Sequence, residues 1–143
     1  MARWMVRWIL GSFLIIFISI NMIQPALANE DATGTWQSVY TFGPVKETMT
    51  ANIQQIGEDL LGSFSVKQTP SGDQYSGILF GTIVGDRIKV YYLSVREKEG
   101  KDPALAITFA DGQVVDENTL KGTYYYQNSD LIGLSGPYEA IRM

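Results

Sequence analysis

After residue 28 the chain alternates apolar and polar side chains in short runs, and this period of two is the feature that most limits its fold. No window of 11 residues in this part keeps the 3.6-residue apolar period of an amphipathic helix. Gly, Asp, Asn and Pro separate runs that are rich in β-branched and aromatic residues. We therefore predict an all-β domain. The expected strands cover residues 34–42, 48–56, 60–68, 75–84, 87–95, 104–115, 119–127 and 136–143.

The links between these strands are short, which favours an antiparallel up-and-down meander of eight strands. Residues 57–59, 85–86 and 116–118 have the composition of tight turns. The pair Asp111-Gly112 leaves the strand number open, because it either closes a hairpin and makes nine strands or forms a bulge inside one long strand. We favour the bulge. Residues 96–103 are charged and are expected to form a solvated loop.

A repeated glycine pattern indicates that the meander curves into a small barrel. An apolar residue, any residue, Gly, then Ser, Thr or Pro, and finally a large apolar residue occur in this order at 32–36, 60–64, 79–83, 120–124 and 134–138. Glycine weakens a strand unless the strand is strongly curved or packs closely against a bulky neighbour. A small closed barrel requires both, and the uneven spacing of the repeats does not fit a solenoid.

Strand parity then assigns the aromatic residues to the two faces of the sheet. In residues 119–127, Tyr124 and Tyr126 fall on the same face as Leu120, whereas Tyr125 points outward. In residues 87–95, Tyr92 falls on the interior face. The outward set on these strands is Tyr91, Leu93 and Tyr125. On the first strand, Trp36, Tyr40 and Phe42 share one face and Val39 lies on the other.

The first 28 residues have the pattern of a secretory signal peptide. Arg3 and Arg7 precede an apolar run of 16 residues, 8–23, and Ala26-Leu27-Ala28 provides small residues for cleavage. A spanning helix needs about 20 mostly apolar residues, so we expect a cleaved signal helix, with an uncleaved N-terminal anchor as the alternative. The protein is then exported and is secreted, periplasmic or in the cell envelope. Residues 29–143 have the size of one domain.

Composition excludes several classes of function. Arg3 and Arg7 belong to the expected signal, so residues 29–143 keep 9 basic and 15 acidic residues, a net charge of −6, which opposes binding to nucleic acid. The same charge opposes an anionic membrane, and we expect membrane contact only through an uncleaved N-terminal segment. The chain has no Cys and no His, which removes disulfides, His-based catalysis and the ordinary zinc site. We expect no enzyme activity, no metal and no cofactor.

The sequence resembles the calycin group, the lipocalins and their short relatives. The likeness rests on Gly34-Thr35-Trp36 at the start of the first strand, on the eight-stranded meander and on Arg142 near the end of the last strand. The repeated glycine pattern and the closing residues 136–143 resemble more closely the small secreted lipocalin-like domains of prokaryotes. In that family the Trp closes one end of the barrel and the Arg lies across its ring. The resemblance therefore implies barrel closure by Trp36 and Arg142.

An eight-stranded barrel is either filled by its own side chains or holds one small ligand, and the sequence leaves both open. We predict that an apolar or amphipathic molecule binds at the open end of the barrel. The expected ligand-binding residues are Tyr92, Tyr124, Tyr126, Tyr40 and Phe64. The alternative is an envelope or extracellular interaction module with a filled core. Its protein partner would bind the outer face near Tyr91, Leu93 and Tyr125.

Overall fold

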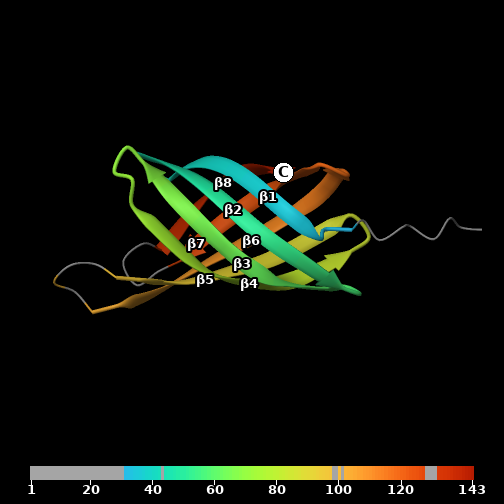
Figure 1. Cartoon of the computed structure of the whole chain (residues 1–143), viewed down its shortest axis with the longest axis horizontal. Coiled ribbons are helices and arrows are strands. Elements are labelled where there is room, and N and C mark those ends of the chain that lie inside the picture. The colour runs from blue at the N-terminus through green and yellow to red at the C-terminus, as the bar shows by residue number, and fades with distance from the viewer. Residues whose placement is uncertain (1–30, 43, 98–99, 101, 128–131) are drawn as a thin grey trace, which may run out of the picture.

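The computed structural model describes residues 31–42, 44–97, 100, 102–127 and 132–143, and of Phe42 and Ile132 it describes only the backbone. Eight antiparallel strands follow one another around a closed barrel (Figure 1), which confirms the predicted meander. The expected signal peptide lies outside the described residues. The strands are β1 (Gly34–Phe42), β2 (Val45–Ile56), β3 (Asp59–Thr69), β4 (Gln74–Val84), β5 (Arg87–Arg96), β6 (Ala104–Asp116), β7 (Thr119–Gln127) and β8 (Ile132–Arg142).

The expected bulge at Asp111-Gly112 is wrong, although residues 104–116 do form one strand. Gly112 pairs with Gly122 without a break, and the shift in register lies between Val114 and Asp116. A side chain at Gly112 would overlap the hydroxyl of Tyr138. The glycine therefore makes room for a tyrosine inside the barrel and does not bend the strand at that point.

The last strand begins earlier than the sequence predicted, at Ile132 in place of residue 136. Its first residues contain Gly133, with φ of 89°, and Ser135. These residues look like a turn in the sequence, but they pair with the end of β7, where the register shifts between Tyr126 and Gln127. The pairing of a long neighbouring strand therefore extends β8 beyond its local preference.

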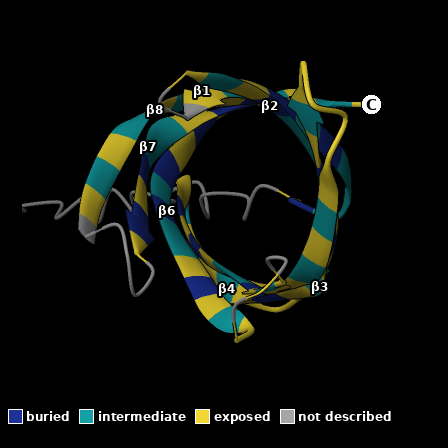
Figure 2. Ribbon diagram, turned by 90° about the vertical axis from the view of Figure 1, so that its left-hand side faces the viewer, coloured by how far each residue is buried: buried dark blue, intermediate teal, exposed yellow. Residues whose placement is uncertain are grey.

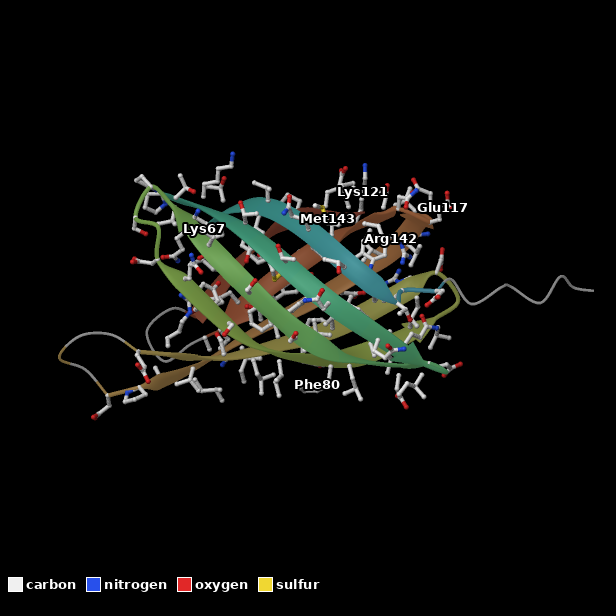
Figure 3. The ribbon with its side chains drawn as sticks, in the orientation of Figure 1. Lys67, Phe80, Glu117, Lys121, Arg142 and Met143 are labelled. Carbon is white, nitrogen blue, oxygen red and sulfur yellow. The ribbon has the colours of Figure 1, made fainter. Side chains whose placement is uncertain are left out.

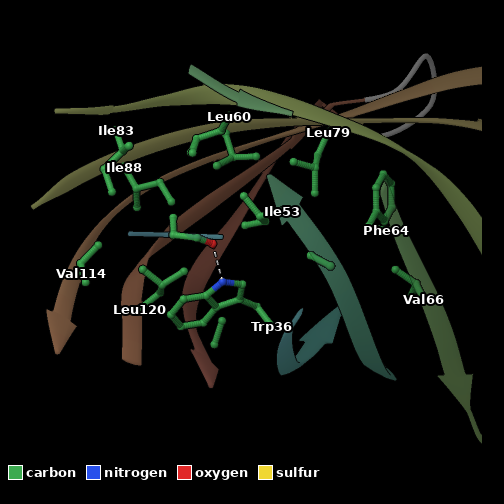
Figure 4. Close-up of a cluster of buried hydrophobic side chains, with 14 residues drawn as sticks. Trp36, Ile53, Leu60, Phe64, Val66, Leu79, Ile83, Ile88, Val114 and Leu120 are labelled. Atoms are coloured by element: carbon green, nitrogen blue, oxygen red, sulfur yellow. Dashed lines mark hydrogen bonds between the residues drawn. The ribbon is translucent and has the colours of Figure 1, made fainter. Parts of the chain in front are cut away.

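Burial follows the period of two along the barrel wall (Figure 2). Ile88, Val90 and Leu120 are buried, as parity predicted, whereas Val39 is exposed. The barrel has two different ends. We call the end where β1 begins the Trp36 end and the end where β1 leads into β2 the Glu47 end. An apolar cluster fills the Trp36 end, where the indole N–H of Trp36 donates to the carbonyl of Ala32 at 2.9 Å (Figure 4).

Arg142 lies across Trp36, with its guanidinium carbon 4.4 Å from the centre of the indole ring. Its side chain also donates hydrogen bonds to three backbone carbonyl groups, those of Glu117 at 2.7 Å, Asp31 at 2.6 Å and Thr33. Figure 3 shows Arg142 and Glu117 close to the same end of the barrel. The contact that the family resemblance implied is therefore present. It joins the chain before β1, the turn between β6 and β7, and β8.

Glycines of the repeated pattern allow close packing, which is one of the two purposes that the sequence suggested. A Cβ at Gly62 or Gly81 would overlap the backbone of the neighbouring strand. A Cβ at Gly136 would instead lie about 3 Å from the ring of Tyr124. Missing side chains thus permit close strand approach at two of these positions and space for a ring at the third.

We predict that Gly62→Ala destabilises the barrel by about 1–3 kcal/mol, because its methyl group would overlap the carbonyl oxygen of Asn52. The neighbouring change Ser63→Ala is the control, since Ser63 points outward and is exposed. We expect it to change stability by less than about 0.5 kcal/mol. Urea denaturation followed by Trp36 fluorescence measures both. Equal effects of the two changes would contradict the close-approach explanation.

We predict that Arg142→Ala destabilises the barrel by about 2 kcal/mol, through loss of the contact with Trp36 and of the hydrogen bonds to three carbonyl groups. Arg142→Lys keeps the charge but not the planar fork of donors, so it should restore only part of this stability. Thermal unfolding of the three proteins measures the difference. Full restoration by lysine would show that charge alone matters at this position.

Candidate functional site

A cavity runs through the interior toward the Glu47 end. Its volume is about 50 Å³, and it opens to solvent. This is room for a few waters and is well below the roughly 300–1,000 Å³ of ordinary ligand pockets, so a larger molecule would also occupy the open part. The cavity is lined by Trp36, Ser38, Tyr40, Glu47, Met49, Ala51, Ile53, Phe64, Tyr75, Ile88, Val90, Tyr92, Ser94, Thr108, Ala110, Leu120, Tyr124, Tyr126, Tyr138 and Ala140.

Small side chains on β6 leave this space unfilled. The inward positions of β6 are occupied by Ala106, Thr108, Ala110 and Gly112 before Val114 restores bulk at the Trp36 end. The interior is therefore packed at the Trp36 end and partly hollow in the other half.

All five residues that the sequence predicted for ligand contact line the cavity. Phe64 packs edge-on against Tyr92, with ring centres 5.3 Å apart. The ring centres of Tyr40 and Tyr124 are 5.4 Å apart, and Tyr126 is buried. Strand parity thus identified side chains that the tertiary structure brings together, while their contact with a ligand stays a prediction.

The seam between β1 and β8 is the least paired part of the barrel wall. These two strands share only the pairs Trp36–Arg142, Gln37–Ile141 and Ser38–Ala140, all toward the Trp36 end. Beyond these pairs, the hydroxyl of Tyr124 donates to the carbonyl of Thr41 at 3.2 Å. The side chain of Tyr124 on β7 therefore bonds to β1 beyond the point where backbone pairing between β1 and β8 has ended, next to the cavity.

A buried carboxylate organises the polar end of the cavity. Glu47 is only 2% exposed. Its two oxygens accept hydrogen bonds from Gln68 Nε2 at 2.6 Å and from the hydroxyl of Tyr75 at 3.0 Å. The nearest cation is Arg96, whose Nη2 lies 4.0 Å from Glu47 Oε1. A carboxylate at this depth needs such partners, because burying an unpaired charge is strongly unfavourable.

Arg96 is incompletely satisfied in this arrangement. Its guanidinium lies over the ring of Tyr75, with Cζ 3.3 Å from the ring centre. Its Nε is buried and has no hydrogen-bond partner among the described residues. A buried donor without an acceptor is uncommon in folded proteins. Arg96 contacts Glu47 but does not itself line the cavity, so this donor lies next to the polar end of the cavity.

Sequence reasoning missed Glu47, Gln68, Tyr75, Arg96 and Tyr138. Glu47 and Arg96 were missed because two strand boundaries were predicted wrongly. The predicted second strand began at residue 48, and residue 96 was assigned to a loop. Extending the parity of Met49 and Ala51 by one position would have placed Glu47 inside. The same extension from Ser94 would have found Arg96.

Burial perturbs the acid–base behaviour of the interior tyrosines. Removal from water raises the pKa of Tyr138 to about 12, with a smaller contribution from the carboxylate of Asp111. The pKa values of Tyr40, Tyr75 and Tyr92 also rise, mainly through burial. For Tyr40 and Tyr75 the negative charge of Glu47 adds to the effect. These hydroxyl groups therefore remain neutral hydrogen-bonding groups at neutral pH.

The residues that the structure describes contain no group of acidic side chains arranged to hold a metal ion. Nor does any helix in the described ranges have the length and apolarity needed to cross a membrane.

We predict that the barrel loses stability as the pH rises from 10 toward 12. In the unfolded chain tyrosine ionises near pH 10, whereas Tyr138 in the folded barrel does so near pH 12, so the unfolded state gains from deprotonation first. Urea denaturation below pH 10 and near pH 12 measures the loss.

Tyr138→Phe should reduce this alkaline loss by about 2–3 kcal/mol, because a shift of two pKa units corresponds to about 2.7 kcal/mol. The matched change Tyr125→Phe removes a hydroxyl from the outer surface, where the side chain is exposed, and should leave the loss as in the wild type. If Tyr138→Phe lost as much stability as the wild type at alkaline pH, the loss could not be attributed to ionisation of Tyr138.

The closed eight-stranded meander agrees with the calycin-type barrel that the sequence resembles. Comparison of the chain with models of protein families, with curated proteins and with solved structures finds no match.

Proposed function

We propose that this chain is an exported, non-enzymatic, lipocalin-like barrel that binds a slender amphipathic molecule in the cavity. The observation that supports this most is the polarity of the cavity along its length. Apolar side chains such as Ile88, Val90 and Leu120 line it toward the Trp36 end, and Glu47 marks its polar end. A molecule with an apolar tail and a polar head matches this gradient.

The head group is expected to accept a hydrogen bond. Arg96 Nε is a buried donor without a described partner, whereas both oxygens of Glu47 already accept bonds from Gln68 and Tyr75. Arg96 lies behind Glu47 and does not line the cavity, so an anionic or neutral acceptor would have to reach past Glu47 to satisfy it. A cationic head would compete with Arg96 for Glu47 and would leave the guanidinium without its counter-charge.

The narrow cavity limits the affinity. A tail that loses about 200 Å² of apolar surface to water contributes about 5 kcal/mol at 25 cal/mol per Å². Micromolar binding corresponds to about 8 kcal/mol. The head group must therefore contribute through hydrogen bonds, and a tail alone is expected to bind weakly.

The test uses three probes with the same tail, namely decanoate, decanol and decylamine, added to protein expressed from the full sequence in an exporting host. Native mass spectrometry first identifies and removes any molecule that co-purifies. Trp36 lines the cavity and is the single tryptophan outside residues 1–28, so its fluorescence reports occupation. We expect decanoate and decanol to bind more tightly than decylamine. Equal or reversed affinities would contradict the role of Arg96.

Two sets of changes separate binding in the cavity from binding elsewhere. Ala110→Leu adds bulk to the β6 wall of the cavity, and Tyr124→Leu with Tyr126→Leu removes two hydroxyl groups from its lining. Both variants should weaken decanoate binding at least tenfold, with a smaller relative effect on stability. Tyr125→Ser on the outer face is the control and should bind normally. Loss of stability with retained binding would contradict the proposal.

A further inference from the structure

The outer surface of β4 to β7 carries a row of four aromatic side chains. Phe80, Tyr91, Phe109 and Tyr125 are successive cross-strand partners on neighbouring strands. Their ring centres are separated by 5.4, 4.8 and 6.0 Å along the row. Figure 3 shows Phe80 pointing away from the barrel. Strand register thus produces a continuous aromatic surface outside the core.

Two further apolar rows extend this surface toward the Glu47 end. One contains Ile78, Leu93 and Ile107, and the other contains Val95 and Leu105, each set by the same register. We call the nine residues of the three rows the outer apolar face. None of them is charged. Ile78 and Val95 are each 60% exposed, so the face is open to solvent in the single chain.

The area of this face is close to what a stable protein interface needs. Seven of its residues are between 36% and 60% exposed, whereas Leu93 and Phe109 are partly buried. Large side chains have about 150–250 Å² each, so the face exposes on the order of 600 Å². A standard interface buries about 800 Å² per partner, and about 600 Å² is at the upper end of the largest apolar patch on typical monomers, which often has a function.

The charges that border the face are arranged symmetrically along β5. The outward residues of this strand and its end are Lys89, Tyr91, Leu93, Val95 and Glu97. Lys89 and Glu97 are each four residues from Leu93, and neither has an ion-pair partner among the described residues. A two-fold axis through Leu93 would place Lys89 of each copy opposite Glu97 of the other.

We propose that the outer apolar face is the interface of a homodimer, in which the β5 strands of two copies lie antiparallel about a two-fold axis at Leu93. A second copy supplies an apolar surface of equal area, and its Lys89 and Glu97 are complementary to those of the first copy in this antiparallel orientation. A reversed, parallel orientation would oppose Lys89 to Lys89 and Glu97 to Glu97. The interface lies outside the barrel, so this proposal does not depend on ligand binding in the cavity.

Cross-linking tests where the two copies meet. The chain has no cysteine, so Leu93→Cys introduces a single reactive thiol near the proposed axis. Two packed sheets are about 10 Å apart, which exceeds the reach of a disulfide but suits a short bis-maleimide. We expect a covalent dimer from Leu93→Cys in the exporting host. Val39→Cys on β1 is the control, because Val39 is also outward and 49% exposed. Equal yields from both variants would overturn the proposal.

A charge exchange tests the symmetry of the interface. Protein expressed from the full sequence should sediment as a concentration-dependent dimer. Lys89→Glu and Glu97→Lys should each weaken the dimer about tenfold, since each creates two like-charge pairs in a symmetric dimer. The double variant Lys89→Glu with Glu97→Lys should return to the wild-type dissociation constant. Failure of the double variant to recover would overturn the proposed orientation.

A different occupant of the face would give a different result. A wild-type protein that stays monomeric and binds phosphatidylcholine vesicles, with Leu93→Lys abolishing that binding, would assign the face to a lipid surface and overturn the dimer. The charge variants should keep wild-type decanoate affinity, because Lys89 and Glu97 do not line the cavity. Loss of the dimer can thus be recognised separately from loss of the ligand site.

Discussion

The contact between Arg142 and Trp36 holds the barrel closed, and the rest of the interior depends on it. Backbone pairing between β1 and β8 extends over only three residue pairs, the shortest of all neighbouring strands. One guanidinium covers the indole ring and binds carbonyl groups from three separate segments at the same end. Side-chain interactions therefore replace the backbone hydrogen bonds that the short seam does not provide. Without this contact, the edges of β1 and β8 would be joined mainly by these three backbone pairs.

Closure at one end allows the other half of the barrel to remain partly hollow. The apolar cluster around Trp36 supplies packing, and the small side chains of β6 then leave space beside Tyr92 and Tyr124. Within this space, burial forces polar groups to find partners, as Glu47 does with Gln68 and Tyr75. The Nε of Arg96, beside Glu47, is an exception among the described residues, and a buried donor of this kind calls for an explanation.

The proposed ligand site and the proposed dimer interface use opposite faces of the same strands. On β5, Val90 and Tyr92 point into the barrel, while Tyr91 and Leu93 point out. A strand with only one covered face normally alternates apolar with polar residues. The outer half of β5 departs from that rule between Lys89 and Glu97, and it does so beside equally apolar stretches of β4 and β6. A strand that is apolar on both sides indicates a second surface to be covered, in addition to the core.

The sequence by itself determined the fold class and the interior or exterior position of residues inside each strand, because the period of two acts locally, but it left eight or nine strands open. Five of the cavity-lining residues followed from parity alone. The tertiary structure decided the rest. Only barrel closure brings Glu47 on β2 within reach of Arg96 on β5, and only cross-strand register aligns Phe80 with Tyr125 across four strands. The role of Gly112 also depended on a distant partner, since it accommodates Tyr138 and does not form a bulge. Local pattern specifies which way a side chain points, whereas its neighbours across the barrel depend on register and closure, which no short segment contains.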